Sequence, residues 1–301
     1  MKKVLFIVAF IASGIGVNAE EYVIPEGVKY VDMYAISNSA LTSVTIPSTA
    51  INMYLGPSVY GESFSKQHDG KAENLGITLN LSLEEINVAS GNPEFSSIDG
   101  VLYNKQQDTL ITCPAKKSSV SIPSSVKVIG SGAFSSCSSL SSIIIPNGVT
   151  EIGASAFVSC TSLNSIILSN SVVSIGNNAF SNCTSLKSIT IPSSVGKIDP
   201  TSFYFCTSLK EINVEPGNPN YCSVDGVLYS KDKTELICVP SGKFAKEGFD
   251  TRSSEAHSED SATKEIKGVW TANGMYVGED VNSMNLPSGV YVIDGKKTII
   301  R

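Results

Sequence analysis

Four cysteines at a constant spacing are the residues of this chain whose chemistry is easiest to specify. Cys137, Cys160, Cys183 and Cys206 follow one another at intervals of 23 residues. If they stack in one register, their side chains lie about 4.8 Å apart, within reach of a disulfide, but parallel side-chain vectors suit that bridge poorly. No histidine lies nearby to complete a zinc site. We therefore expect four buried thiols that act as small apolar side chains.

The other chemically active residues form no recognisable catalytic set. The chain has two histidines, His68 and His257, and neither fits a pattern of nucleophilic catalysis with a serine or cysteine. No glycine-rich phosphate loop is present, and the carboxylates are scattered. The formal charge of −6 argues against a basic face for nucleic acid. The sequence predicts no catalytic residue, no cofactor and no metal, and thus a protein that is not an enzyme.

The elements that position the cysteines repeat with the same period. Columns of valine, alanine, phenylalanine and leucine accompany the cysteine column, and they include Val126, Val149, Val172 and Val195, and Leu140, Leu163, Leu186 and Leu209. A fixed period in this range is typical of a solenoid, in which each unit buries its apolar face against its neighbours.

One unit shows which elements to expect. Phe134, Cys137 and Leu140 follow at spacings of three, which suits a short helical or 3₁₀ turn with one buried side. Ile143 and Ile145 then alternate with outward residues and predict a short strand. The predicted fold class is an α/β solenoid of leucine-rich-repeat type, with parallel strands on the concave face and short helical or 3₁₀ turns on the convex face.

The repeat also resembles a known family. The pattern IPxxVxxIGxxAFxxCxSLxxIxI holds over four contiguous units and is similar to the BspA-like leucine-rich repeats of bacterial surface proteins. It lacks the inward asparagine that follows the strand in commoner leucine-rich repeats; Gly148, Ser171 and Ser194 stand there. The resemblance implies adhesion to host matrix or plasma glycoproteins, or to other microbes.

A second, longer repeat lies at both ends of these units. Residues 82–114 recur at 208–240, offset by 126 residues. Each copy contains a hairpin signal, Asp99-Gly100 or Asp225-Gly226, so we expect hairpin blocks at 82–117 and 208–243. The second block contains three acidic residues, Asp225, Asp232 and Glu235. We interpret them as residues that favour turns rather than as ligands of a calcium loop.

The solenoid is expected over residues 20–243, starting with a degenerate first unit. Residues 48–81 do not fit the period and are interpreted as an irregular coil or an inserted loop. Residues 1–19 read as a signal peptide that is too short to span a bilayer; cleavage after Ala19 removes two lysines and changes the formal charge from −6 to −8. The chain is therefore expected to be exported, to the cell surface, the outer membrane or the extracellular space, without a transmembrane segment.

The C-terminal part changes character twice. Residues 244–264 are polar and predict a flexible linker, and residues 265–301 contain two hairpin signals and predict a small β-module. Residues 286–291 resemble the sorting domain of type IX secretion substrates; the alternative is a module that merely protects the chain end. Ser261 in the linker and Thr109 lie in motifs that resemble bacterial O-glycosylation sites, and Ser261 is the more accessible candidate.

Outward positions of the predicted strands provide the best candidate site. They form a nearly neutral strip with two aliphatic side chains, made of Ser142, Ile144, Ser165, Ile167, Ser188 and Thr190. Such a surface suits docking of a protein, although strand propensity alone also places isoleucine there. The strip has no aromatic platform for a sugar, but Tyr103 and Tyr229 in the hairpin blocks, and Tyr54 and Tyr60 in the irregular region, offer one. The alternative function is thus a glycan-binding or periplasmic scaffold protein without a host partner.

Overall fold

The computed structural model describes three stretches in full: residues 21–32, 41–54 and 82–243. It also describes four C-terminal strands. The predicted signal peptide 1–19, most of the predicted irregular region 48–81, the predicted linker 244–264 and Ser261 lie outside the described residues.

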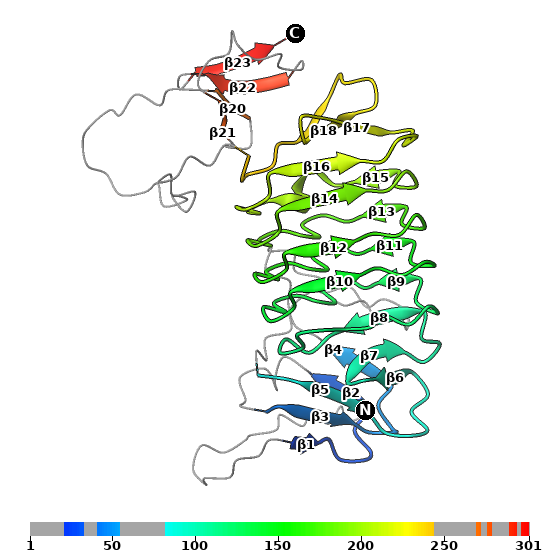
Figure 1. Ribbon diagram of the computed structural model, residues 1–301. Coiled ribbons are helices and arrows are strands. Elements are labelled where there is room, and N and C mark those ends of the chain that lie inside the picture. The colour runs from blue at the N-terminus through cyan, green and yellow to red at the C-terminus, as the bar shows by residue number, and fades with distance from the viewer. Residues whose placement is uncertain are drawn as a thin grey trace, which may run out of the picture.

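Successive coils stack along one axis and confirm the predicted solenoid (Figure 1). Strands β10 (Ser142–Ile144) and β12 (Ser165–Ile167) pair in parallel, and so do β14 (Ser188–Ile191) and β16 (Glu211–Val214). In both pairs each residue faces the residue 23 positions further on. Strands β1 (Glu21–Val23), β3 (Ser43–Ile46) and β5 (Glu85–Val88) form a similar parallel sheet nearer the N-terminus. We call these seven strands the long-strand face.

A second ladder, which the sequence did not predict, runs along the stack. Strands β9 (Val128–Ile129), β11 (Glu151–Ile152), β13 (Ser174–Ile175) and β15 (Lys197–Ile198) have only two residues each and pair in parallel. They continue into the first hairpin block, so that one sheet has the order β15-β13-β11-β9-β8-β7-β6. A separate parallel pair, β2 (Tyr30–Asp32) with β4 (Asn52–Tyr54), belongs to the first coils.

The turns that carry the cysteines are less helical than expected. Only the last of them contains a 3₁₀ helix, Pro200–Phe203, within the described residues. In the first, the amides of Gly132, Phe134 and Ser136 donate to carbonyls of the next coil, while the amides between them bond locally. Ser136 also has a left-handed backbone, with φ of 60°. The turn is therefore a third ladder between coils, and alternating bonds of this kind prevent a continuous helix.

Buried columns fill the space between these ladders. The phenylalanine column is a stack of nearly parallel rings, with centroid distances of 4.8 Å from Phe134 to Phe157 and 5.4 Å from Phe157 to Phe180. Phe203 continues the stack, 5.6 Å from Phe180. The alanine, cysteine, leucine and valine columns are buried beside it. Because each ring contacts the next coil, the stack joins the coils into one core.

The two hairpin blocks fold alike. The first contains β6 (Phe95–Ile98), β7 (Val101–Asn104) and β8 (Thr109–Thr112); the second contains β17 (Tyr221–Val224), β18 (Val227–Ser230) and β19 (Leu236–Cys238). Both residues of each turn dipeptide, Asp99-Gly100 and Asp225-Gly226, have positive φ, as a type I′ turn requires. The second block ends the described solenoid.

The C-terminal strands form an antiparallel sheet of their own. Strands β20 (Val269–Thr271), β21 (Tyr276–Gly278), β22 (Gly289–Ile293) and β23 (Lys296–Ile300) have the order β21-β20-β22-β23. No helix in the described part of the chain has the length and hydropathy that a bilayer span needs.

Candidate functional site

The structure places the two aliphatic residues of the predicted strip side by side in solvent. The side chains of Ile144 and Ile167 are 64% and 57% exposed. The two residues are register partners in the β10–β12 ladder, and so are Ser142 and Ser165. An exposed isoleucine pair therefore lies next to an exposed serine pair on adjacent strands.

Alternation along the strand explains why these isoleucines face outward. Their neighbours Ile143 and Ile166 point into the core and are buried. A strand turns successive side chains to opposite faces, so burial of one isoleucine of each pair exposes the other. The core thus fixes the positions of Ile144 and Ile167.

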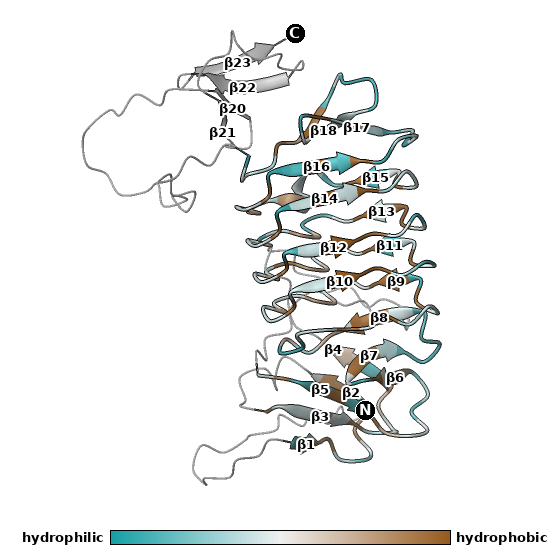
Figure 2. Cartoon of the chain, viewed as in Figure 1, coloured by the Kyte–Doolittle hydropathy of each residue, from teal (hydrophilic) through white to brown (hydrophobic). Residues whose placement is uncertain are grey.

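The second half of the strip is polar. Ser188 and Thr190 are exposed on β14, where they pair with Glu211 and Asn213 of β16. No strand pairing joins β12 to β14 within the described residues, although the two strands are neighbours in the stack. The hydropathy of the strands falls from β12 to β16 (Figure 2). The strip therefore consists of an apolar part on β10 and β12 and a polar part on β14, which pairs with β16.

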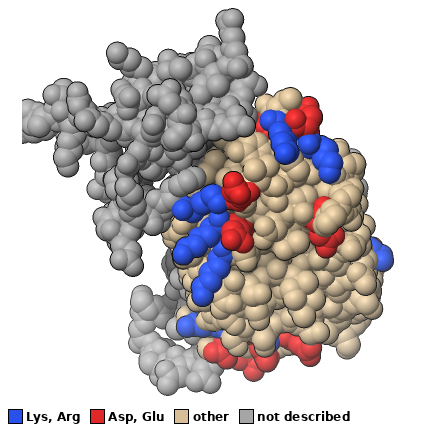
Figure 3. All heavy atoms as spheres, turned by 45° about the horizontal axis from the view of Figure 1, so that its top comes forward, with Lys and Arg blue, Asp and Glu red and all other residues tan. Residues whose placement is uncertain are grey.

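Charged side chains on the solenoid leave a broad uncharged area between them. In Figure 3 they gather mostly toward the edges of the face shown, and the area between is occupied by other residues. At the positions just before the long strands, the sequence changes from Ser141 and Asn164 to Lys187 and Lys210, all exposed. The apolar part of the strip thus has neutral neighbours.

The cysteine column is buried, as predicted, and has an additional role. The thiols of Cys160, Cys183 and Cys206 donate to the carbonyls of Phe134, Phe157 and Phe180, at 3.0, 3.1 and 3.0 Å. These contacts join each coil to the preceding one. All seven cysteines are free thiols, and Cys222 is the one that is only half-buried. The column therefore has a structural role, because it joins adjacent coils.

The alternative sites are less well formed. No group of three or more histidine, cysteine, aspartate or glutamate residues gathers in the described part of the chain as a metal site would require. The carboxylate of Asp232 accepts hydrogen bonds from Ser230 and Thr234 within its own turn, which lowers its pKa. Tyr103 is completely buried and offers no platform to a sugar, and Tyr229 is half-buried.

The O-glycosylation candidate inside the solenoid lies in a strand. Thr109 is half-buried in β8, and its hydroxyl donates to Asp108 Oδ1 at 3.1 Å. Its modification stays a prediction.

Two buried asparagines were missed by the sequence analysis. Asn218 donates through its side-chain amide to the carbonyls of Pro192 and Val195, and its Oδ1 accepts from the amides of Asn220 and Tyr221. Asn92 makes the equivalent four contacts in the first block. The signal was present: both stand in the tripeptide Gly-Asn-Pro, 126 residues apart, and Asn218 continues the valine column of the repeat. Each links its hairpin block to the preceding coil.

An exposed aromatic residue was also missed. Phe205 is 55% exposed and has a left-handed backbone, with φ of 59°, where the three preceding coils have Ser136, Ser159 and Asn182. Its ring contacts Tyr204 edge-on at 6.2 Å. Such a conformation is unusual for a bulky residue, and the sequence contains no sign of it apart from the break in the serine column.

Parallel ladders with a 23-residue period, a buried leucine column and an exposed strand face define a leucine-rich-repeat solenoid. The model of the BspA type leucine rich repeat region matches residues 16–60 and 111–222, in six copies, which is just over half of the chain. The chain belongs to this family.

The chain is also similar to several solved structures. The pneumococcal vaccine antigen PcpA is 22% identical, with a TM-score of 0.50, over 66% of this chain and 52% of that one. A leucine-rich repeat protein from Eubacterium ventriosum is 25% identical, with a TM-score of 0.49, over 65% and 55%. A leucine rich cell surface protein from Faecalibacterium prausnitzii is 26% identical, with a TM-score of 0.45, over 65% and 60%. This chain thus spans little more than half the length of these structures. A comparison with curated proteins finds no match.

Proposed function

We propose that this protein is a non-catalytic adhesin of the cell surface that binds a partner protein through the strip on its long-strand face. The partners are host matrix or plasma glycoproteins, or proteins of other microbes. The observation that carries the proposal is the exposure of Ile144 and Ile167 as register partners, with neutral hydroxyl side chains beside them.

The energetics of such a strip suit protein binding. Full burial of an isoleucine side chain contributes about 1.5–3 kcal/mol, so the pair supplies a small apolar centre. Ser142, Ser165 and Ser188 provide hydroxyl groups at its margin, where interfaces are commonly polar. The three parallel ladders hold the backbone, so little conformational entropy is lost on binding.

A binding screen of the mature chain distinguishes this function from glycan recognition. Matrix and plasma glycoproteins are tested before and after enzymatic removal of their glycans, next to an array of free glycans. We expect binding to a protein that survives deglycosylation. Binding that disappears with the glycans, or that appears only on the array, favours the glycan-binding alternative. Absence of any binding favours a periplasmic scaffold.

We also propose that residues 265–301 are a sorting or anchoring module. Support comes from the antiparallel sheet β20–β23, whose strands pair only with one another among the described residues, and from the likeness of residues 286–291 to type IX sorting domains. Removal of residues 265–301 is expected to leave the chain in the periplasm of a host with that pathway, as measured by cell fractionation. Unchanged surface exposure of the truncated chain contradicts the sorting role.

A further inference from the structure

The two hairpin blocks have the same internal structure but different surroundings. In both, the third strand pairs with the second through the same irregular register: Tyr103 faces Leu110 in the first block, and Tyr229 faces Leu236 in the second. In the first block the other edge of β8 pairs in parallel with β9. In the second block β19 is the edge strand of its sheet among the described residues.

We call the first block the inner block and the second block the outer block, and the pairing of β8 with β9 the inner junction. The inner junction shows what the third strand of a block can bind at its free edge. The amides of Lys127 and Val128 donate to the Asp108 carbonyl at 2.7 and 3.0 Å, and the Gly130 amide donates to Leu110 at 2.9 Å. The coil that brings these amides also covers the block, so that Leu110 is fully buried in one cluster with Val126 and Ile129. The block is therefore a docking end for a leucine-rich-repeat coil.

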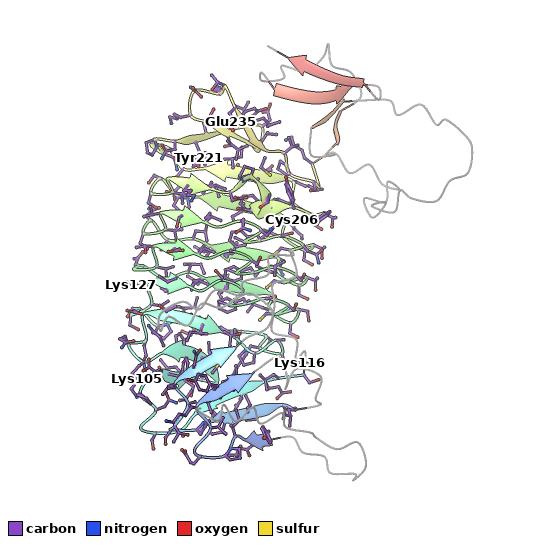
Figure 4. All side chains as sticks on the ribbon, turned by 180° about the vertical axis from the view of Figure 1, so that it is seen from behind. Lys105, Lys116, Lys127, Cys206, Tyr221 and Glu235 are labelled. Atoms are coloured by element: carbon purple, nitrogen blue, oxygen red, sulfur yellow. The ribbon has the colours of Figure 1, made fainter. Side chains whose placement is uncertain are left out.

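In the outer block no described strand pairs with the other edge of β19. Leu236 takes the place of Leu110, but it is half-buried. Figure 4 shows Glu235, which precedes it, at the C-terminal end of the stack, whereas Lys105 of the inner block lies away from that end. Strand β19 thus offers an edge and a partly exposed leucine that fit a further coil.

The first coil of the chain has the matching edge. By the repeat pattern, β2 is the counterpart of β9, with Tyr30 in the place of Val128 and Val31 in the place of Ile129. Strand β2 pairs only with β4 among the described strands, and the Lys29 carbonyl accepts from Ile51 and Asn52 on that side. Its other edge therefore corresponds to the edge of β9 that bonds to β8.

We propose that a second copy of this chain docks its first coil on the outer hairpin block, head to tail, with β2 parallel to β19. The register copies the inner junction: Tyr30 faces Glu235 as Val128 faces Thr109, and Val31 faces Leu236 as Ile129 faces Leu110.

The backbone agrees with this register. Asp32 stands in the place of Gly130, where a Cβ atom would come within 2.8 Å of the Leu110 carbonyl. Asp199 occupies the same column in the last coil, and its amide still donates to Ile175 at 3.1 Å. An aspartate is therefore compatible with the ladder at this position.

A contact of this kind does not close on itself. When the rotation between successive copies does not close a ring, head-to-tail contacts produce open chains of molecules. One strand pair with a few apolar side chains makes a small interface, so the association is weak in solution. It gains strength where many copies share one surface. This inference does not depend on the identity of the partner bound by the strip.

The first test uses cysteine cross-linking of two differently tagged full chains. One carries Glu235→Cys and the other Tyr30→Cys, both at exposed positions. Adjacent strands bring these residues about 4.8 Å apart in the proposed register, and a short bis-maleimide linker joins the two thiols without the geometry that a disulfide requires. We expect a mixed dimer after addition of the linker. In the control the second chain carries Val173→Cys, an exposed residue away from both ends. Cross-linking equal to that control, or only between two Glu235→Cys chains, overturns the proposal.

The second test uses sedimentation over about a hundredfold range of concentration. Tyr30→Pro removes an amide of the free edge of β2, whereas Tyr30→Ala removes the same side chain and keeps the amide. We expect Tyr30→Pro to weaken self-association by about tenfold relative to Tyr30→Ala, the effect of losing one hydrogen bond. A monomer at all concentrations, or equal association of the two variants, contradicts the proposal.

Discussion

Replacing Phe157 with alanine is expected to lower the free energy of unfolding by about 3–5 kcal/mol. Phe157 is completely buried between the rings of Phe134 and Phe180. Its removal leaves a cavity in the middle of the stack and eliminates two ring contacts at once. Because coils are stabilised mainly by their neighbours, a weakened central coil also weakens both halves of the solenoid. Urea denaturation followed by circular dichroism measures the change.

A matched control for this substitution is Phe205→Ala. Phe205 is mostly exposed and strained by its left-handed backbone, so its loss is expected to change stability by no more than about 0.5 kcal/mol. If Phe157→Ala is no more destabilising than Phe205→Ala, the phenylalanine stack does not hold the coils together.

Raising the pH above about 9 is expected to destabilise the protein steeply, because buried thiols resist ionisation. Burial raises the pKa of Cys238 to about 12, and it is also the main cause that raises the pKa of Cys183 and Cys206. The pKa of Cys137 is raised too, first by its side-chain hydrogen bond with Cys113 and then by burial.

The direction of this effect follows from proton binding. Above the thiol pKa of the unfolded chain, the unfolded state loses protons that the folded state keeps, so stability falls as pH rises. The stabilisation that comes from keeping these thiols protonated is complete below about pH 8.5, and it is lost as the pH rises toward the pKa of the thiols in the folded state. For Cys238 alone the loss is of the order of 4 kcal/mol by pH 12, at about 1.4 kcal/mol for each unit of pKa.

Urea denaturation at a series of pH values measures this loss. Cys238→Ala is expected to reduce the slope of stability against pH between about 9 and 11. Cys222→Ala is the control, since that side chain is only half-buried. A flat profile for the unmodified chain, or equal slopes for the two variants, contradicts the role given to buried thiols.

The strands of the fold differ in how well the sequence predicts them. The period-two pattern that ends in Ile143 and Ile145 is long enough to identify the long strands. The two-residue strands such as Val128–Ile129 are too short to show a period, and their pairing comes from the stacking of coils. The turn at Ser136 resembles a helix in its spacing of apolar residues, but its amides alternate between local bonds and bonds to the next coil. Sequence spacing does not distinguish the two arrangements.

The exposure of residues in the candidate site could be predicted only where it follows from the alternation of side chains along a strand. The exposure of Ile144 and Ile167 follows from burial of their neighbours, so the repeat register was sufficient. The division of the strip between β12 and β14 depends on backbone pairing that residue types do not reveal. Asn92 and Asn218 read as loop residues in the sequence, because Gly-Asn-Pro is a common turn tripeptide. Their burial follows from the coil that each hairpin block covers.

The measurement that tests the binding strip most directly is the affinity of the double variant Ile144→Asp with Ile167→Asp for the protein found in the screen. Two charges in the apolar centre of an interface are expected to weaken binding at least about thirtyfold, roughly the effect of losing one interface hot spot. Val173→Asp is the control, because Val173 is a similarly exposed aliphatic residue beside the short strand β13. Both variants should unfold at the temperature of the unmodified chain. We predict lost binding in the double variant and normal binding in the control; normal binding in the double variant would show that the strip is not the contact surface.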